Sequence, residues 1–272
     1  MLEALLAALA GFLIGSFLNV CIYRLPLDLS VVAPRSFCPG CDKPIAWYDN
    51  VPLLSYAILK GRCRQCRERI SWRYPVVELL TAAAFFYSVY RLGLTPAALK
   101  FCLYGAILIT LIFSDLEEQI LPDEFTKGGT VAGVLFAIFV PLPPGLMTLF
   151  IPPSAGQRVH SVSESIFAAA FCAGALWLVA TLYEKVRHRE GLGFGDVKMV
   201  AMIGAFVGLQ AAMLTLIAGS LLGSVVGLLY IWITGKDAST YELPFGSFLG
   251  IAALGVAFFG EPVLGWYIHL GR

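Results

Sequence analysis

Residues 101–123 read FCLYGAILITLIFSDLEEQILPD, an apolar run that ends abruptly in an acidic loop. With the residues before it, the run gives a mostly apolar segment over 97–114, close to the roughly 20 residues that a membrane-spanning helix needs. Asp115 follows this segment directly. A carboxylate at the edge of a membrane segment is costly to bury and is usually retained for a function. The stretch therefore predicts a membrane helix that ends in a functional acid.

The composition of the whole chain extends this interpretation. Of its 272 residues, 58% are hydrophobic and 14% are charged, with a mean hydropathy of +0.80, whereas a soluble domain carries about 25% charged residues. We therefore expect an all-α polytopic membrane protein whose surroundings are the lipid bilayer. The net charge of +1 gives no reason to expect a nucleic-acid partner. About eight transmembrane helices are predicted, over residues 2–23, 75–92, 97–114, 128–150, 163–183, 198–209, 211–233 and 247–269.

Several segment boundaries can be inferred from local residues. No Lys or Arg precedes the first segment, so we expect a retained helix rather than a secretion signal. The prolines from Pro141 onward end the fourth segment because proline lacks the amide proton that a helix needs. Residues 151–162 are expected to form an exposed loop. The sixth segment is short and rich in glycine, so it is either a half-span or continuous with the seventh.

The distribution of positive charge predicts the topology. Fifteen of the 19 lysines and arginines fall on one side of the predicted membrane, nine of them in the loop 24–74. Cytoplasmic loops are enriched in these residues, so this loop is expected to face the cytoplasm. The segment ends that carry the two acidic motifs, at Asp115 and Asp196, are expected on the same side. We divide the chain into a first transmembrane helix (1–23), a cytoplasmic loop domain (24–74) and a transmembrane helical domain (75–272). Outside the loop the cytoplasmic charges are Lys127, Lys185, Arg187, Arg189, Lys198 and Lys236, and those expected on the opposite side are Arg91, Lys100, Arg158 and Arg272.

Four cysteines of the loop domain have the spacing of a metal site. Cys38 and Cys41 form one CxxC pair, and after 21 residues Cys63 and Cys66 form a second. Two such pairs supply four thiolates to one tetrahedral zinc ion, and a reducing cytoplasm favours zinc over disulfides. A single redox-active CxxC, or cysteines without a shared role, remain the alternatives. The other three cysteines lie in apolar segments and are expected to be small buried hydrophobic residues: Cys21, Cys102 and Cys172.

A second acidic motif, GFGDVK at residues 193–198, precedes another apolar run. Its Asp196 and the earlier Asp115 are expected on the same side of the membrane at similar depth. Two carboxylates that share one proton can activate a water molecule for attack on an amide. Gly193 and Gly195 would allow the sharp turn and close helix approach that such a meeting requires. The sequence thus predicts an aspartic protease site made by Asp115 and Asp196.

Other charged residues compete for these roles. Glu117 and Glu118 lie in the loop proper and are expected to be solvated. Asp123 follows Leu121-Pro122 and is expected to cap the next helix, although it is also the reserve candidate for the acidic pair. Lys198 would neutralise the pair or meet a substrate carboxylate, or it would serve as an ordinary interfacial anchor.

The order of motifs along the chain resembles the type IV prepilin peptidases, also called leader peptidase/N-methyltransferases. The resemblance runs through nearly the whole chain, and the motifs together are far more specific than any one alone. They are GSFLNV (15–20), RLP (24–26), PRS (34–36), DNVPLLSY (49–56), GRCRQC (61–66), RYPVVE (73–78), the acidic stretch from Asp115 to Asp123, and GxGDxK (193–198).

The resemblance implies a bifunctional enzyme of the bacterial inner membrane. It would remove the short basic leader from prepilins and pseudopilins at the cytoplasmic face, with Asp115 and Asp196 as the catalytic pair. It would then methylate the new N-terminal amine with S-adenosylmethionine. No GxGxxG nucleotide motif marks the site of this methyl donor. The polar residues nominated near it are Arg73 and Glu78, together with Asn19, Arg24 and Asn50.

Three other functions are weighed against this one. A peptidase without methyltransferase activity would share the acidic motifs, although the intact cysteine loop argues against it. An ion-coupled transporter could use the same aspartates, and would show discontinuous helices and charges near the middle of the membrane. A zinc-containing scaffold would explain residues 38–66 but would leave the two acidic motifs without a role.

Overall fold

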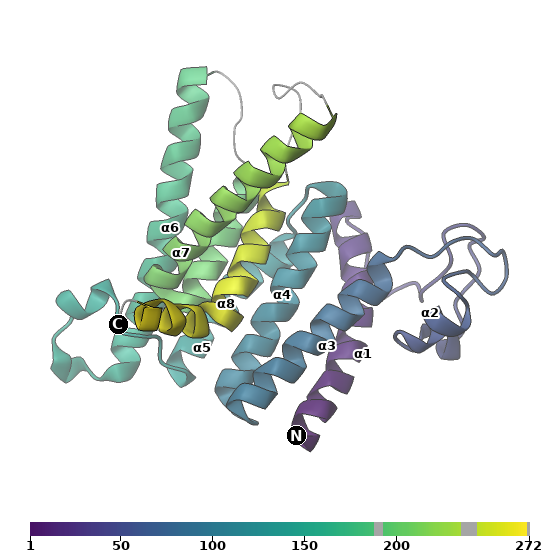
Figure 1. Ribbon diagram of the computed structural model, residues 1–272, viewed down its shortest axis with the longest axis horizontal. Helices are drawn as coiled ribbons and strands as arrows, with labels where there is room; N and C mark the ends of the chain where they lie inside the picture. The colour runs from purple at the N-terminus through teal and green to yellow at the C-terminus, as the bar shows by residue number, and fades with distance from the viewer. Residues whose placement is uncertain (188–192, 235–243, 271–272) are drawn as a thin grey trace. The chain divides into compact units, whose positions relative to one another are not determined.

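The computed structural model describes residues 1–187, 193–234 and 244–270. Within these ranges the chain forms helices and no strand, apart from isolated bridges at Phe37–Pro44 and Arg62–Arg69 (Figure 1). The all-α prediction is confirmed. The α-helices are α1 (Leu2–Arg24), α2 (Leu54–Ile58), α3 (Arg73–Leu92), α4 (Pro96–Glu118), α5 (Asp123–Phe139), α6 (Gln157–Arg187), α7 (Phe194–Thr234) and α8 (Phe245–Leu270). The short 3₁₀ helices are η1 (Leu25–Leu27), η2 (Trp47–Asn50), η3 (Leu146–Leu149) and η4 (Pro153–Ala155).

Four of the described helical segments are long and apolar enough to cross a membrane: Leu2–Leu27, Pro96–Glu118, Gln157–Arg187 and Phe194–Ile233. They contain five of the eight predicted segments, because the sixth and seventh lie together in α7. The break between those two is at Gly208, whose φ of 79° and ψ of 175° are not helical. A left-handed φ is readily adopted by glycine, which has no Cβ. The two predicted segments thus follow one another directly with only this break between them, and whether the first is a half-span stays a prediction.

Two predicted boundaries were wrong. The fourth segment, expected over 128–150, ends at Phe139, and Val140 is already extended where the prolines begin. The loop expected over 151–162 is partly helical, because α6 begins at Gln157. Gln157, Arg158 and Val159 at the start of α6 are exposed and only Ser161 of residues 157–162 is buried, so hydropathy alone does not reveal that the helix begins this early. Three of the basic residues used for the topology, Arg189, Lys236 and Arg272, lie outside the described residues.

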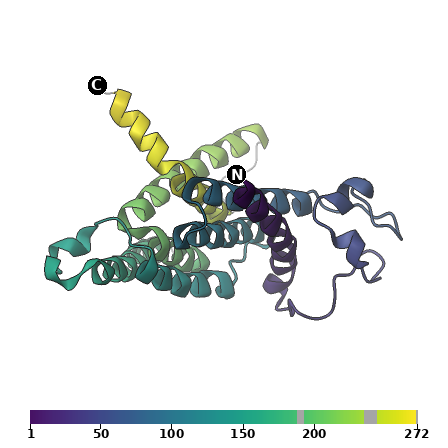
Figure 2. The ribbon, with the colours of Figure 1, turned by 90° about the horizontal axis from the view of Figure 1, so that it is seen from below.

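The chain divides into two compact units, Met1–Ser114 and Asp115–Arg272. The sequence-based division at residues 23 and 74 stays a prediction. In the first unit α1 packs along α3, and residues 25–72 between them form a loop-rich lobe with little regular structure (Figure 2). A Cβ on Gly11 would lie 2.7 Å from Cα of Ala82, and one on Gly15 only 2.8 Å from Cα of Glu78. The glycine pair therefore allows a close backbone approach of the GxxxG kind.

In the second unit α7 is the central element, in contact with α5, α6 and α8. A Cβ on Gly204 of α7 would lie 2.7 Å from the carbonyl oxygen of Ala168 in α6, so these helices also meet through small residues. The N-terminal half of α7 carries Asp196, and its contacts with α5 and α6 hold that half in place. The fold of this unit thus positions the second acidic motif.

Glu164 of α6 is buried. It accepts hydrogen bonds from two backbone N–H groups, one in η3 and one in α7, that have no acceptor within their own helix. Its carboxylate accepts the N–H of Leu209 at 3.4 Å, directly after the break at Gly208, and the N–H of Met147 at 3.1 Å in η3. A helix start leaves amide protons without intrahelical acceptors. Inside a bilayer no water could satisfy them, so a buried carboxylate supplies the acceptor.

Two serines on the same face of α6 act in the same way. Ser161 donates its hydroxyl proton to the carbonyl of Ala137 at 2.7 Å and accepts the N–H of Leu142 at 2.9 Å, so it bridges the end of α5 and the proline-rich chain after it. Ser165 donates to the carbonyl of Ala205 at 2.8 Å, which lies just before the break in α7. The polar face of α6 therefore satisfies the backbone at both helix interruptions.

We predict that Glu164→Ala lowers the stability of the protein. The substitution leaves two partly buried N–H groups without an acceptor, which should reduce the free energy of unfolding by about 2 kcal/mol. Thermal unfolding in detergent, followed by circular dichroism, should show a melting temperature lower by several degrees. The melting temperature of Glu164→Gln should lie between those of the wild type and Glu164→Ala, because the glutamine amide keeps one acceptor oxygen. The control is Glu184→Ala, an exposed position on the same helix, and equal losses for both alanine variants would contradict the prediction.

Candidate functional site

The structure brings Asp115 and Asp196 together within the second unit. Asp115 lies in the last turn of α4 and Asp196 in the first turn of α7, and their exposed fractions are 5% and 8%. Both face Gly246 at the start of α8. A Cβ built on Gly246 would lie 3.1 Å from Oδ2 of Asp115 and 3.1 Å from Oδ1 of Asp196. The two carboxylates therefore border one small space, which a larger side chain at residue 246 would fill.

Asp115 is held by the N-terminus of α8. Its Oδ2 accepts the backbone N–H of Ser247 at 2.6 Å and the hydroxyl of Ser247 at 2.8 Å. The first turn of a helix carries unsatisfied amide protons and the positive end of the helix dipole, so it attracts a carboxylate. One oxygen of Asp115 is thus fixed by α8, and the other oxygen is left for further interactions.

Gly246 and Ser247 were not recognised from the sequence. The signal available for them is the stretch Pro244-Phe245-Gly246-Ser247, in which proline precedes the start of an apolar helix. Proline and serine are both favoured at helix starts. That pattern could have placed a helix N-terminus here, but not its contact with Asp115, which is 132 residues distant in the sequence.

Leu121 covers the same space from the loop that follows α4. After Gln119, whose φ of 54° turns the chain, Leu121 is buried and its side chain lies close to two glycines. A Cβ on Gly195 would lie 3.2 Å from Leu121 Cβ, and one on Gly246 3.1 Å from Leu121 Cδ1. Gly195 was expected to permit a close approach, and it does contact Leu121 closely.

Asp123, the reserve candidate for the acidic pair, lies in an ion-pair network. It is exposed and pairs with Lys127 at 2.6 Å and with Lys198. Hydrogen bonds from Lys127 and then Lys198 lower the pKa of Asp123 below its usual value. The expected cap is wrong: α5 begins at Asp123 itself, and no side chain caps it. Glu117 and Glu118 are exposed, as expected, but they lie in the last turn of α4 and not in the loop after it.

The four loop-domain cysteines converge in the first unit. Their Sγ atoms all lie within 4.8 Å of one another, and those of Cys38 and Cys66 are 3.6 Å apart. A disulfide needs about 2.05 Å between its sulfurs. Four thiolates about 2.3 Å from one tetrahedral zinc are about 3.8 Å apart. The cluster therefore has the donor set and spacing of a metal site rather than of a disulfide.

The two CxxC turns have the same backbone design. Each turn is closed by an isolated antiparallel β-bridge. The bridges join Phe37 to Pro44 around the first cysteine pair and Arg62 to Arg69 around the second. Asp42 and Arg67, each one residue beyond its second cysteine, have left-handed φ values of 54° and 62°. Backbone N–H groups of Cys66 and Gln65 lower the pKa of the Cys63 thiol to about 7. A thiol so stabilised as thiolate is suited to metal binding.

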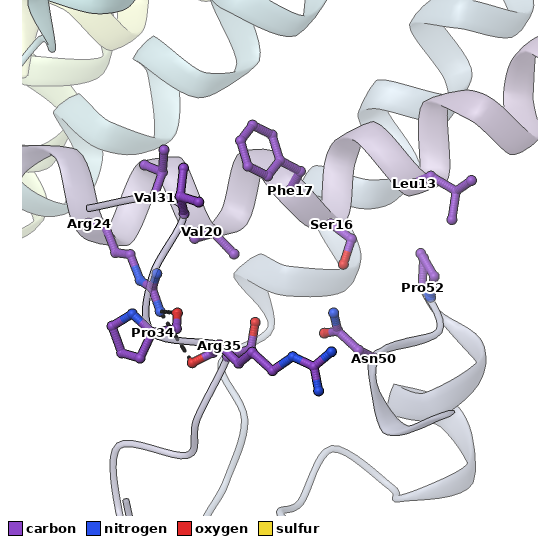
Figure 3. A pocket seen from close by; sticks show the side chains of 12 residues that line it. Leu13, Ser16, Phe17, Val20, Arg24, Val31, Pro34, Arg35, Asn50 and Pro52 are labelled. Atoms are coloured by element: carbon purple, nitrogen blue, oxygen red, sulfur yellow. Dashed lines mark hydrogen bonds between the residues drawn. The ribbon is translucent and has the colours of Figure 1, made fainter. Parts of the chain in front are cut away.

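The polar residues nominated for the methyl donor occupy two kinds of position. Asn50 and Arg24 line a pocket of about 330 Å³ in the first unit (Figure 3). Asn19, Arg73 and Glu78 are buried and do not line it. Asn19 donates its amide proton to the carbonyl of Tyr74 at 3.1 Å, a hydrogen bond between α1 and α3.

The chain matches two protein-family models. Residues 9–92 match the bacterial Peptidase A24 N-terminal domain, and residues 102–228 match the type IV leader peptidase family. No solved structure matches the chain.

Curated relatives agree with these matches. The chain is 33% identical to a prepilin leader peptidase/N-methyltransferase of Legionella pneumophila, over 97% of the chain and 94% of the relative. It is 39% identical to the protein so named in Myxococcus xanthus, over 85% of the chain and 64% of the relative. With the protein so named in Pseudomonas aeruginosa the identity is 32%, over 96% of the chain and 92% of the relative.

Proposed function

The chain belongs to the type IV leader peptidase family, and we propose that it removes the leader peptide of prepilins and pseudopilins and then N-methylates the new N-terminus. Near-complete coverage of the relatives supports both activities, because matches to the N-terminal and the peptidase domain account for most of the chain. It is therefore an enzyme of two activities within one membrane-embedded chain.

We assign the cleavage step to Asp115 and Asp196. The observation that carries this assignment is the shared space over Gly246, which both carboxylates border at the ends of α4 and α7. Two buried carboxylates this close are expected to share one proton. The unprotonated oxygen can then take a proton from a water molecule in that space. Asp115 contributes the oxygen that Ser247 leaves open.

The reaction balances with these groups alone. The water oxygen attacks the scissile carbonyl carbon while one carboxylate takes its proton and the other gives its own proton to the carbonyl oxygen. The C–N bond then breaks as the leaving nitrogen takes a proton from the pair, and one hydroxyl of the tetrahedral intermediate returns its proton to the pair as the carbonyl re-forms. The products are a carboxylic acid at the end of the leader and an amine on the mature chain, which ionise in water to a carboxylate and an ammonium, and the pair again holds one proton.

The topology follows from the same assignment. We place the active site at the cytoplasmic face of the bacterial inner membrane, where 15 of the 19 lysines and arginines are expected. We also propose that α3, α5 and α8 cross the bilayer beside the four candidate spans, with α7 contributing two segments around Gly208, which gives about eight spans. The substrate's own apolar helix would then reach the pair from the lipid.

Methylation uses S-adenosylmethionine, which when bound supplies an electrophilic methyl group. The amine released by cleavage would take the methyl group and lose one proton, and the donor would leave as S-adenosylhomocysteine once its S–CH3 bond is broken. Arg73 and Glu78 were nominated for this site, and both are buried. Glu78 accepts the N–H of Leu53 at 2.8 Å, and Arg73 lies over the ring of Tyr74, 4.8 Å from its centroid. We propose that Arg73 and Glu78 hold the walls of the methyl-donor region in place.

The four-cysteine cluster is proposed to bind one structural zinc ion. The lobe of residues 25–72 contains little regular structure, so metal binding would supply a large share of its folding energy. Zinc held by four cysteines has no open coordination position and takes no part in the chemistry.

The transporter alternative is favoured by two features, the break in α7 and the buried Glu164. Both oxygens of Glu164, however, accept backbone N–H groups at the helix interruptions. This carboxylate is therefore occupied as a structural acceptor, which argues against a role in ion coupling.

Asp115→Asn and Asp196→Asn should each lower leader cleavage by about 10³-fold, because the pair loses the group that accepts or donates the proton. The measurement is mass spectrometry of a purified prepilin incubated with the detergent-solubilised enzyme and S-adenosylmethionine. The wild type should yield the mature chain with one added methyl group. Asp123→Asn, in the exposed ion pair, is the matched control and should cleave normally. Leader removal without the methyl group would indicate a peptidase alone, and substantial cleavage by either variant of the pair would overturn the assignment.

Gly246→Val should reduce cleavage by about 100-fold, since new methyl groups would displace both carboxylates and misplacement by about 1 Å has effects of this size. Gly246→Ala should show a smaller loss. Gly255→Ala is the control on the same helix, because a Cβ there meets nothing within 4 Å. Cleavage rates are compared only between variants that have similar unfolding temperatures. Equal activity of the residue 246 variants and the control would show that the space over Gly246 is not the reaction site.

The purified protein should contain about one zinc per chain by elemental mass spectrometry, as a single site of four cysteine thiolates requires. Replacing Cys38 and Cys63 together by serine should release the metal and increase proteolysis within residues 34–70. Cys102→Ala, outside the cluster, should retain it. A wild-type protein that is folded and free of zinc would remove this proposal.

A further inference from the structure

Residues 50–59, NVPLLSYAIL, form an uncharged segment in a lobe that is otherwise rich in charged residues. The segment runs from the end of η2 through α2. Leu54 and Ile58 of α2 are 57% and 64% exposed. Residues four apart lie on one side of a helix, so these side chains form an apolar face that the described part of the chain leaves open. An exposed apolar face of this kind marks a surface for lipid or for another protein.

The contacts of this segment show where it lies along α1. A Cβ on Gly15 would lie 2.8 Å from Cα of Glu78, so these residues of α1 and α3 are at one level. Leu53, just before α2, donates its N–H to the carboxylate of Glu78 at 2.8 Å. Pro52 lines a pocket together with Leu13 of α1 (Figure 3). The start of α2 therefore lies beside the middle of α1 and not beyond its end.

The length of α1 converts this level into a depth in the bilayer. Leu2–Leu27 is one of the candidate spans, and Arg24 is its first charged residue after Glu3. A charged residue near the end of a span marks the level of the lipid headgroups. Gly15 precedes Arg24 by nine residues, which is about 13 Å of helix, and half of the hydrocarbon core is about 15 Å thick. Residues level with Gly15 therefore lie within one leaflet when α1 spans the bilayer.

The backbone at the start of α2 is satisfied without water. Glu78 accepts the N–H of Leu53. The buried hydroxyl of Ser55 accepts the N–H of Val51 at 3.1 Å and donates to the carbonyl of Tyr48 at 2.9 Å. A solvated loop can leave such groups to water, whereas a segment at the level of the acyl chains cannot. These side chains thus give the segment the internal bonding that immersion in lipid requires.

The residues on either side of the segment suit a membrane–water interface. Trp47 and Tyr48 precede it and are both exposed, and aromatic side chains of this kind are enriched at the headgroup level. The charge of Asp49 is paired with Arg64 at 2.6 Å. Lys60 is exposed directly after the segment, and its long side chain can reach the headgroups. The uncharged segment is therefore bracketed by interfacial side chains.

We propose that residues 50–59 lie in the cytoplasmic leaflet, with Leu54 and Ile58 against the acyl chains and Trp47 among the headgroups. Interfacial helices bury their apolar face about 5–10 Å into the boundary between headgroups and acyl chains. The lobe of residues 25–72 is then not wholly cytoplasmic, because a short part of it re-enters the membrane beside α1 and α3. The charged second cysteine turn, residues 62–69, stays in water. This inference concerns membrane contact and does not depend on either enzymatic activity.

The test adds one tryptophan at a time to the full-length protein in phosphatidylcholine nanodiscs that hold a single chain. Leu54→Trp and Ile58→Trp place the probe on the apolar face of α2. Gln65→Trp, at an exposed position of the second cysteine turn, is the matched control. The emission due to each probe is the difference from the parent protein, whose five native tryptophans are common to all variants. An unfolding temperature equal to that of the parent shows that a variant is folded.

Phosphatidylcholine brominated near the glycerol end of its acyl chains should quench about half of the emission added at residues 54 and 58, because interfacial side chains lie at that depth. Aqueous acrylamide should quench only the probe at residue 65. If acrylamide quenches the probes at residues 54 and 58 as strongly as the control, the segment is a solvated loop and the proposal is wrong. Shielding of these probes from both quenchers would show that protein covers the face, which would also overturn the proposal.

Discussion

The bond between the carboxylate of Asp115 and the first turn of α8 is the constraint on which the acidic site depends. A carboxylate buried at the end of an apolar helix requires donors, and the unsatisfied amides of another helix start are a strong source of them. Ser247 supplies both a backbone and a side-chain donor. Because Gly246 precedes it, the same turn leaves room for the second carboxylate. Fixing one acid at a helix terminus thus also sets where its partner and a water molecule can lie.

The same physical rule operates at the other polar positions of the second unit. A segment in lipid must satisfy its backbone internally, so any interruption of a helix needs a side chain that substitutes for the missing partner. Ser161, Glu164 and Ser165 of α6 provide these substitutes at the end of α5 and at the break in α7. The buried polar residues of α6 therefore differ in use from the acidic pair. Both oxygens of Glu164 accept backbone N–H groups at helix interruptions, whereas the acidic pair borders an open space over Gly246.

Much of this organisation could be predicted from the sequence, because the signals are local. Apolar runs gave the helical class, two CxxC turns gave the cysteine cluster, and acids next to apolar runs gave Asp115 and Asp196. What could not be predicted depends on contacts between distant segments. The sequence predicts a loop at the polar start of α6 because residues 157–162 are mostly polar, and the bond of Ser161 to the end of α5 is visible only once both helices are placed. Gly246 and Ser247 were missed for the same reason, since neither has a distinctive chemistry until Asp115 is placed beside it.

The two proposed activities differ in what they require of water, and the two units differ accordingly. Proton transfer within a carboxylate pair is strengthened by a poorly solvated site, and both aspartates are almost fully buried. A methyl donor with a carboxylate and a sulfonium is strongly hydrated and must exchange with solvent after each transfer. The residues proposed for the methyl-donor region, Arg73 and Glu78, belong to Met1–Ser114, whereas the acidic pair belongs to Asp115–Arg272. The product of cleavage, a free amine, is then the chemical link that orders the two steps.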